Sequence, residues 1–391
     1  MGVNKMDNKW ITVSFFGISL LVLLILENRA LFIGAISSYI IIKRPRYRGF
    51  WLLSIILCAI GIAVFMKTDS SLGRLLVYKI STSIFHDNWL YGCGLGQFGQ
   101  VYLIEQAKYF SQPGFDNKEL LLADNTIYAF NDWYQLVCET GLLGILSILL
   151  FCHAIYRLDY FFENRKFFWD KVFFLTILIS ALFTHLFEKQ YILLFMAIIF
   201  FGMILKKFDS IQNIILLRLM FKVILFWFGV NAFHSIYIES RLKESIQLSN
   251  SGQFYRSNIL LDELRRDGNC SSDCVFFYSR NCARLGRTDE AIQALEKLTL
   301  RETNSLYHSL LADLYCARND YAMAEKNLLL AINMVPNRFE ERYKLLELYQ
   351  KKQDSINSIK VASSIIELPV KVNSDRIQFI KQYSNQILNT Y

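Results

Sequence analysis

The chain has few charged residues and little that could bind a metal. Only 19% of its 391 residues are charged, against 53% that are hydrophobic, and this balance argues against an ordinary soluble protein. Its eight cysteines include no CxxC pair, and no group of histidines and cysteines has the spacing of a zinc site. We therefore expect neither a metal nor a cofactor.

The positive charge of the chain does not indicate nucleic-acid binding. The formal net charge is +8, but many of the basic residues lie beside apolar segments, where orientation in a membrane explains them. We expect no nucleic-acid partner.

Long apolar runs fill residues 1–235. A bilayer core takes roughly 20 apolar residues per helix. The second run, Ala30–Ile42, is shorter than this, so alone it could be a re-entrant or interfacial segment. The runs predict an all-α, multi-pass transmembrane domain of about seven helices, near Trp10–Leu26, Ala30–Ile42, Phe50–Phe65, Gly141–Tyr156, Val172–Leu186, Tyr191–Leu205 and Ile215–Ser235.

Basic residues fall in alternate loops of this arrangement. With a cytoplasmic N-terminus, the basic clusters within Lys43–Arg48, Arg157–Lys171 and Lys206–Lys207 all lie on the cytoplasmic side, as the positive-inside rule requires. The orientation predicts a large outer loop at about residues 66–140 and places residues 236–391 on the outer side. No small-residue cleavage site follows the first run, which we interpret as an anchor.

A repeating pattern of small and bulky residues marks the carboxy-terminal part. The stretch Ser305–Arg338 is typical of a tetratricopeptide repeat, with packing positions at Leu311, Ala312, Tyr315, Ala324, Leu328, Ala331 and Pro336. Ala291 stands at the position of Ala324 in the preceding copy, and a weaker copy begins at Phe339. Each repeat needs neighbours to bury its apolar face, so residues 236–391 are predicted to form one solenoid of about three or four repeats. The solenoid either binds a partner protein or substrate on a concave surface, or only stabilises the preceding domain.

The outer loop contains glycines at short spacing. Gly92, Gly94, Gly96 and Gly99 superficially match a dinucleotide-binding fingerprint, but no strand precedes them and no βαβ unit surrounds them. We expect them instead to permit tight turns and close backbone approach beside a ligand.

Two longer motifs flank and include these glycines. The pattern D-x-W-L-x-G-x-G-x-G-x-F begins at Asp87, and N-D-W-Y-Q-L-x-x-E-T-G-L-L-G begins at Asn131. Their order resembles the O-antigen ligase and polymerase superfamily over roughly Arg29 to Gly144. The resemblance implies a glycosyltransferase of the bacterial inner membrane, with the repeat domain in the periplasm. Its donor would be a polyprenyl-diphosphate-linked glycan, and its acceptor the lipid A core for a ligase or another lipid-linked glycan for a polymerase.

The resemblance also implies roles for particular residues. Arg29 and Arg74 match family arginines at the outer face, and a guanidinium is suited to a bidentate grip on a diphosphate. Arg29 could instead serve only as an interfacial anchor, and Arg74 could only pair with a loop carboxylate. Many family members have a His-Asn pair where this chain has Phe130 and Asn131, and phenylalanine cannot move a proton.

Other residues must therefore carry the acceptor chemistry if the chain is an enzyme. We expect Asn131 to orient a sugar hydroxyl and Asp124 or Asp132 to assist the acceptor. The missing histidine and the short membrane domain leave a second hypothesis open, namely a non-catalytic membrane scaffold that recruits a partner protein through its repeats.

Overall fold

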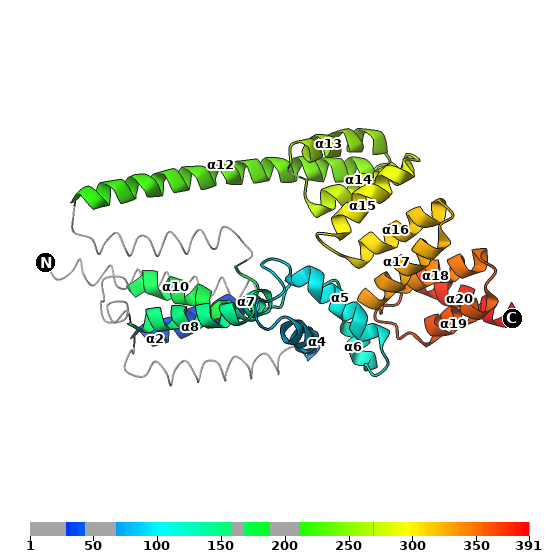
Figure 1. Ribbon diagram of the computed structural model, residues 1–391, viewed down its shortest axis with the longest axis horizontal. Helices are drawn as coiled ribbons and strands as arrows, with labels where there is room; N and C mark the ends of the chain where they lie inside the picture. The colour runs from blue at the N-terminus through cyan, green and yellow to red at the C-terminus, as the bar shows by residue number, and fades with distance from the viewer. Residues whose placement is uncertain (1–28, 44–67, 158–167, 188–210, 269, 391) are drawn as a thin grey trace. The chain divides into compact units, whose positions relative to one another are not determined.

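A computed structural model describes residues 29–43, 68–157, 168–187, 211–268 and 270–390 of the chain (Figure 1). The regular elements among these residues are all helices, and none of the described residues forms a strand. The chain divides into two compact units. The first comprises residues 1–74, 85–95 and 128–219, and the second comprises residues 75–84, 96–127 and 220–391.

The first unit is built around a close pair of helices. Its elements are α2 (Arg29–Lys43), both ends of α4 (Thr68–Asp87), α7 (Asp132–Thr140), α8 (Leu142–Arg157), α10 (Phe168–Ser180) and the start of α12 (Ile211–Asn250). Gly34 lets α2 approach α10, because a Cβ there would lie 2.2 Å from Ser180 Oγ. The Ser180 hydroxyl donates to the backbone oxygen of Ala30 at 2.9 Å.

The predicted multi-pass transmembrane fold class is wrong. Among the residues that the structure describes, no helix is both long enough and apolar enough to cross a membrane. The α2, α8 and α10 helices have 15, 16 and 13 residues, fewer than the roughly 20 that a bilayer core takes. The α12 helix has 40 residues, but Arg218 and Lys222 interrupt its apolar part. The predicted spans Trp10–Leu26, Phe50–Phe65 and Tyr191–Leu205 lie outside the described residues.

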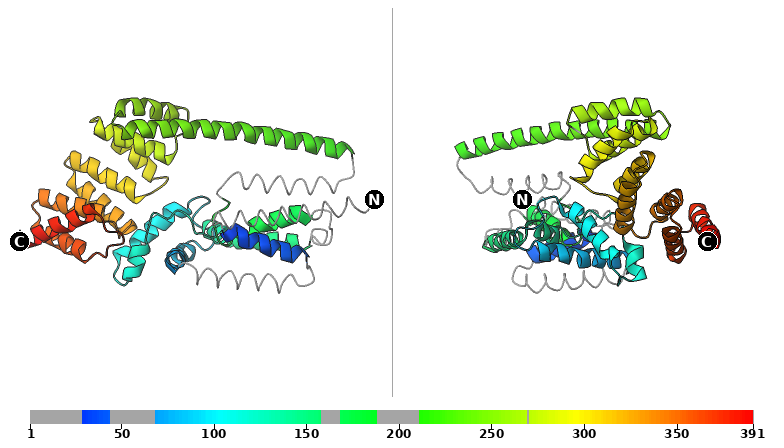
Figure 2. Two further views of the ribbon diagram at one scale, coloured as in Figure 1. Left: turned by 180° about the vertical axis from the view of Figure 1, so that it is seen from behind. Right: turned by 45° about the vertical axis from the view of Figure 1, so that its right-hand side comes forward.

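The second unit contains a run of antiparallel helix pairs (Figures 1 and 2). The first pair consists of the end of α12 and α13, which are joined by an ion pair between Arg241 and Glu263 at 2.8 Å. The following helices are α13 (Phe254–Arg266), α14 (Ser272–Arg284), α15 (Thr288–Thr299), α16 (Ser305–Ala317), α17 (Tyr321–Met334), α18 (Phe339–Lys351), α19 (Ser355–Glu367) and α20 (Asp375–Thr390). We call the end of α12, α14, α16, α18 and α20 the first helices. Neighbouring first helices contact one another, α14 with α16 and α18 with α20.

Buried residues at a constant spacing hold the pairs together. The first helices bury Ser245, Ser279, Ala312 and Leu346, which recur with a period of about 34 residues, as in tetratricopeptide repeats. The second helices bury Ser257, Ala291, Ala324 and Ser358 with the same period. Each of these residues is at most 1% exposed, and most are small, so the paired helices pack closely. The chain therefore carries a tetratricopeptide-type helical-repeat domain of four pairs, and the predicted repeat is confirmed.

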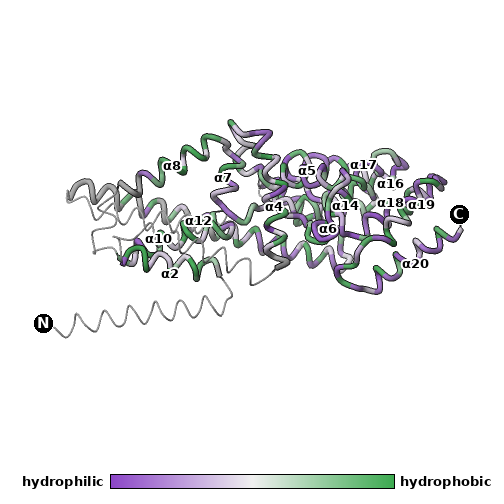
Figure 3. Tube along the Cα trace, turned by 90° about the horizontal axis from the view of Figure 1, so that it is seen from below, coloured by the Kyte–Doolittle hydropathy of each residue, from purple (hydrophilic) through white to green (hydrophobic). Residues whose placement is uncertain are grey.

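Polar side chains fix where these helices begin. The side chains of Ser271, Asn304, Asp320 and Asp354 accept hydrogen bonds from backbone N–H groups in the first turns of α14, α16, α17 and α19. Such N-caps contribute about 1 kcal/mol each. Along the helices, hydrophilic and hydrophobic residues alternate as expected for surfaces buried on one side (Figure 3).

Part of the predicted outer loop belongs to the second unit. The middle of α4, α5 (Phe98–Ser111) and α6 (Asn117–Leu122) group with the repeats, and α5 packs against α17.

Candidate functional site

Arg74 is held by contacts inside the first unit. Its Nη1 donates to the backbone oxygen of Phe183 at 3.0 Å, and its guanidinium lies 5.5 Å from the centre of the Phe130 ring. Phe130 has a φ of 55°, which is rare for a residue with a side chain. Arg74 thus ties the turn after α10 to the segment before α7.

A histidine lies beside Phe130 although none occupies that sequence position. The His185 ring stacks on Tyr128 with 4.5 Å between centres, and it meets the Phe130 ring edge-on at 6.0 Å. Sequence reasoning did not assign His185 to this place, because it follows Phe130 only after α7, α8 and α10, and no local pattern links the two. Arg74, Tyr128, Phe130 and His185 therefore form one partly buried group.

The two polar residues at the start of α7 bind backbone. The Asn131 side chain accepts from the Tyr134 N–H at 3.0 Å and caps α7. The Asp132 carboxylate is 7% exposed and accepts from the N–H groups of Leu186, at 2.6 Å, and Phe187, at 3.1 Å. These contacts give both residues a structural role.

Asp124 belongs to the other unit. Its side chain is 71% exposed, and its Oδ1 lies 3.6 Å from Nη2 of Arg338 in the second unit. The structure therefore gathers Arg74, Asn131 and Asp132 within the first unit and Asp124 within the second. Arg29 begins α2, and its proposed grip on a diphosphate stays a prediction, as does that of Arg74.

The glycine-rich loop packs on its own chain. Gly92 has a φ of 72°, and a Cβ there would lie 2.2 Å from the backbone of Glu139. The Gly94 N–H also donates to the Glu139 oxygen at 2.9 Å. The expected close backbone approach is therefore present, but its partner is the end of α7.

Lys344 of α18 and Asp313 of α16 form an ion pair between two first helices, which we call the charged pair. Lys344 Nζ lies 2.6 Å from Asp313 Oδ2 and donates to Ser309 Oγ at 2.9 Å. Burial raises the pKa of the Asp313 carboxyl above its ordinary value, while Lys344 opposes the shift. The Asp313 side chain is 48% exposed and the Lys344 side chain is 24% exposed, so the pair is accessible to solvent.

An aromatic patch lies beside the charged pair, on α18 and α20. We define the aromatic patch as Glu340, Tyr343, Arg376, Phe379 and Tyr383. The guanidinium of Arg376 lies 4.8 Å from the Tyr343 ring centre and 5.4 Å from that of Phe379. Nε and Nη2 of Arg376 donate hydrogen bonds to the two carboxylate oxygens of Glu340, at 3.1 and 2.8 Å. The rings of Phe379 and Tyr383 stack at 6.3 Å, and Phe379 is 46% exposed.

The phenol of Tyr343 is a stable donor in this patch. Burial and a hydrogen bond to Glu347, 2.8 Å away, raise the pKa of Tyr343 to about 12. Residues 340, 343, 344 and 347 share one face of α18, so the charged pair and the aromatic patch lie on one side of the repeats.

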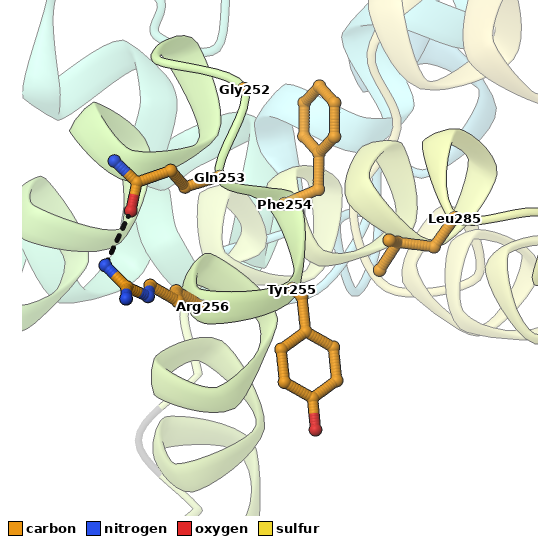
Figure 4. A pocket seen from close by; sticks show the side chains of 6 residues that line it. All are labelled: Gly252, Gln253, Phe254, Tyr255, Arg256 and Leu285. Atoms are coloured by element: carbon orange, nitrogen blue, oxygen red, sulfur yellow. Dashed lines mark hydrogen bonds between the residues drawn. The ribbon is translucent and has the colours of Figure 1, made fainter.

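A pocket of about 640 Å³ lies at the α12–α13 turn. It is lined by Gly252, Gln253, Phe254, Tyr255, Arg256 and Leu285 (Figure 4). The rings of Phe254 and Tyr255 point in opposite directions, and Arg256 donates to Gln253 Oε1 at 3.1 Å. Its polar groups do not converge on a common point, which a small-molecule site requires.

The cysteines of the repeat domain are partly oxidised. Cys270 and Cys274 form a disulfide, whereas Cys282 and Cys316 are free thiols. Within the described part of the chain, no group of three or more metal-ligating side chains could hold an ion.

Comparisons with known proteins give little beyond this geometry. No protein-family model and no curated protein matches the chain. Among solved structures, it is similar to MamA AMB-1 in a P212121 crystal form and to MamA MSR-1 in a C2 form, at 15% identity and a TM-score of 0.32 in each case. The matches cover 40% of this chain and 84% and 88% of the MamA chains. A likeness of this size carries no argument, so the repeat architecture rests on the helix pairs themselves.

Proposed function

We propose that the protein is a non-catalytic scaffold that recruits a partner protein through its first helices. The observation that carries this proposal is the aromatic patch on α18 and α20 beside the charged pair of Asp313 and Lys344. Tyrosine, other aromatic residues and arginine are the side chains that dominate binding energy at protein interfaces.

The patch is held in place before any partner arrives. The paired contacts between Arg376 and Glu340 fix the guanidinium over two rings, so little side-chain freedom is lost on binding. Phe379 offers a half-exposed apolar surface, and the charged pair beside the patch offers both signs of charge. This combination suits a peptide segment with an apolar anchor flanked by polar groups.

A capture experiment with the full chain tests the proposal. Immobilised wild-type protein, Phe379→Ala and Arg376→Ala are exposed to an extract of the producing cells, and the retained proteins are quantified. We expect one partner to be retained by the wild type and reduced at least tenfold by either substitution. Ile356→Ala, at a 70% exposed position on α19, is the matched control. Equal retention by all four chains contradicts the proposal.

Glycan transfer by a ligase or polymerase stays an untested prediction. Two of its candidate residues, Asn131 and Asp132, already bind backbone groups, which favours the scaffold. Transfer would require Arg74, so loss of glycan transfer in Arg74→Ala, with the protein still folded, would revive the enzyme hypothesis.

The periplasmic location of the repeats also stays a proposal. The Cys270–Cys274 disulfide supports an oxidising compartment, because such bonds are rare in the cytosol. Thiol alkylation of the protein in intact cells should label Cys270, the partly exposed residue of the two, only after reduction. Labelling without reduction would contradict this location.

A further inference from the structure

One edge of the repeat domain is already occupied by the chain's own helix α5. This loop edge consists of α17, the α15–α16 connection and the α17–α18 connection. Helix α5 packs against α17, and its residues Phe98, Tyr102 and Leu103 are at most 1% exposed. Ala107 and Phe110 continue the same apolar stripe. One face of α5 is thus buried against the repeats, as in a helix that lies on a receptor surface.

A fully buried amide connects α5 to the repeats. Gln106 is 0% exposed, and its Nε2 donates to the backbone oxygen of Met334 at 2.5 Å and to that of Asp124 at 2.9 Å. Its Oε1 accepts from the Tyr102 hydroxyl at 2.7 Å. The amide nitrogen and oxygen are thus both hydrogen-bonded, which offsets the cost of burying them.

The repeats also supply the missing cap of α6. The Asn337 Nδ2 lies within hydrogen-bond distance of the backbone oxygens of Leu120, Leu121 and Ala123, at 3.1, 3.2 and 2.6 Å. Carbonyls in the last turn of a helix have no partner within the helix. Asn337, 214 residues further along the chain than Ala123, satisfies them from the α17–α18 connection.

Contacts at the end of this segment use both connections of the edge. Asn125 Nδ2 donates to Ser305 Oγ at 3.0 Å, and the Ser305 N–H donates back to Asn125 Oδ1 at 3.2 Å. Arg338 donates to Ser305 Oγ at 3.2 Å and faces the Asp124 carboxylate.

The repeats hold the segment through both its backbone and its side chains, because Asn337 contacts backbone oxygens whereas Ser305 and Arg338 contact the side chains of Asn125 and Asp124. Specificity for the segment comes from these side-chain contacts and from the apolar stripe of α5 that begins at Phe98 and ends at Phe110. Such recognition does not depend on the segment belonging to the same chain.

We propose that the loop edge is a helix-docking site whose resident ligand, in cis, is the segment of residues 96–127. A partner protein that presents an amphipathic helix with the same stripe, followed by a short capped helix, binds there by displacing α5. The tether keeps the resident segment at an effective concentration on the order of millimolar, so it excludes weaker helices. This site is separate from the aromatic patch, and the inference goes beyond the scaffold function.

The test uses the full chain and a labelled synthetic peptide of residues 96–127. Tyr102→Ala in the chain weakens the resident segment and leaves the loop edge intact. We expect this variant to bind the peptide at least tenfold more tightly than the wild type, as measured by fluorescence anisotropy. Ile104→Ala changes a 37% exposed position on the same helix and should behave like the wild type.

A second substitution locates the binding site. Adding Asn337→Ala to Tyr102→Ala removes the cap from the edge and should abolish the gain. Hydrogen exchange on the Tyr102→Ala chain should show faster exchange in α5 and α6 with unchanged protection in α15–α18.

Three results overturn the proposal. Equal peptide affinity for the wild type and Tyr102→Ala shows that the segment does not block a site. A gain that survives Asn337→Ala places peptide binding elsewhere. Lost protection throughout α15–α18 in Tyr102→Ala shows that α5 is a fixed part of the core. None of these results bears on partner capture by the aromatic patch.

Discussion

The candidate polar residues of the two units are used differently. In the first unit, the side-chain oxygens of Asn131 and Asp132 accept hydrogen bonds from backbone N–H groups of the turns around them. In the second unit, pairs such as Lys344 with Asp313 and Arg376 with Glu340 join neighbouring first helices and stay accessible. A motif residue is available for chemistry only when the fold does not already need its side chain, and on that criterion the repeats offer the better surface.

The units also differ in what stabilises them. The repeats have a continuous core in which Leu261, Leu295 and Leu328 are at most 1% exposed. The first unit has a smaller cluster of described buried residues, around Ile41 and Val172. Substitutions in one unit should therefore act on that unit, and the predictions below test this separation.

The largest effect is expected from Leu328→Ala in α17. Leu328 is 1% exposed, and truncating such a leucine removes apolar burial and leaves a cavity, at a cost of about 2–5 kcal/mol. Hydrogen exchange should become faster throughout α14–α19, while protection in α2 and α10 stays unchanged. Leu329→Ala, at a 42% exposed neighbouring position, should cost less than about 0.5 kcal/mol. Loss of protection in α2 and α10 would show that the two units unfold together.

A smaller effect is expected from Asp132→Ala in the first unit. Two N–H groups lose a buried charged acceptor, at a cost of about 1–3 kcal/mol. Exchange of the Leu186 and Phe187 amides should become faster, and Asp132→Asn should restore part of the protection because an amide oxygen still accepts. The matched control is Asp124→Ala, which removes a 71% exposed carboxylate and should cost less than about 1 kcal/mol. A loss in Asp132→Asn as large as in Asp132→Ala would argue for a role of the charge itself.

The repeat domain was largely predictable from sequence, and the reason is local. Ala291 and Ala324 mark equivalent buried positions of successive repeats, and each repeat packs on its neighbours. The pair formed by the end of α12 and α13 was harder to see, because Ser245 and Ser257 replace alanine at those positions.

Helix ends in the first unit were not predictable from composition. Val172–Leu186 reads as one apolar span, yet α10 ends at Ser180. The Asp132 N–H donates to the Ala181 oxygen, and the Asp132 carboxylate holds the N–H of Leu186, so a tertiary contact fixes a turn within the apolar run. Apolar composition reports burial and does not set the length of a helix.

The docking of α5 was also beyond sequence reasoning. Gln106 and Met334 are 228 residues apart and meet only because of the fold. The polar character of Gln106 gave no signal, since an isolated glutamine on an apolar face has no distinctive pattern.

The smallest effect concerns pH and His308 in the repeat core. His308 Nε2 lies 2.8 Å from the Thr303 hydroxyl, and its Nδ1 lies 2.8 Å from Asn327 Oδ1. Asn327 Nδ2 donates to the Met323 oxygen, so Oδ1 must accept and His308 Nδ1 carries the proton. Burial lowers the pKa of His308 below its ordinary value of 6.5, and the neutral ring fits both partners.

This shift makes the second unit less stable in mild acid. Above pH 6.5 the ring is neutral in both the folded and the unfolded chain, so its contribution is fully present. Below that pH the unfolded chain takes up a proton that the folded chain resists, and stability falls by up to about 1.4 kcal/mol per pH unit until the folded pKa is reached. Thermal unfolding midpoints and hydrogen-exchange rates in α16 and α17, both measured across this pH range, should show this decline. In His308→Gln the decline should be shallower, because only the remaining groups titrate. An identical pH dependence in the two chains would show that His308 does not titrate differently on folding, and that the acid sensitivity of the repeats arises from other groups.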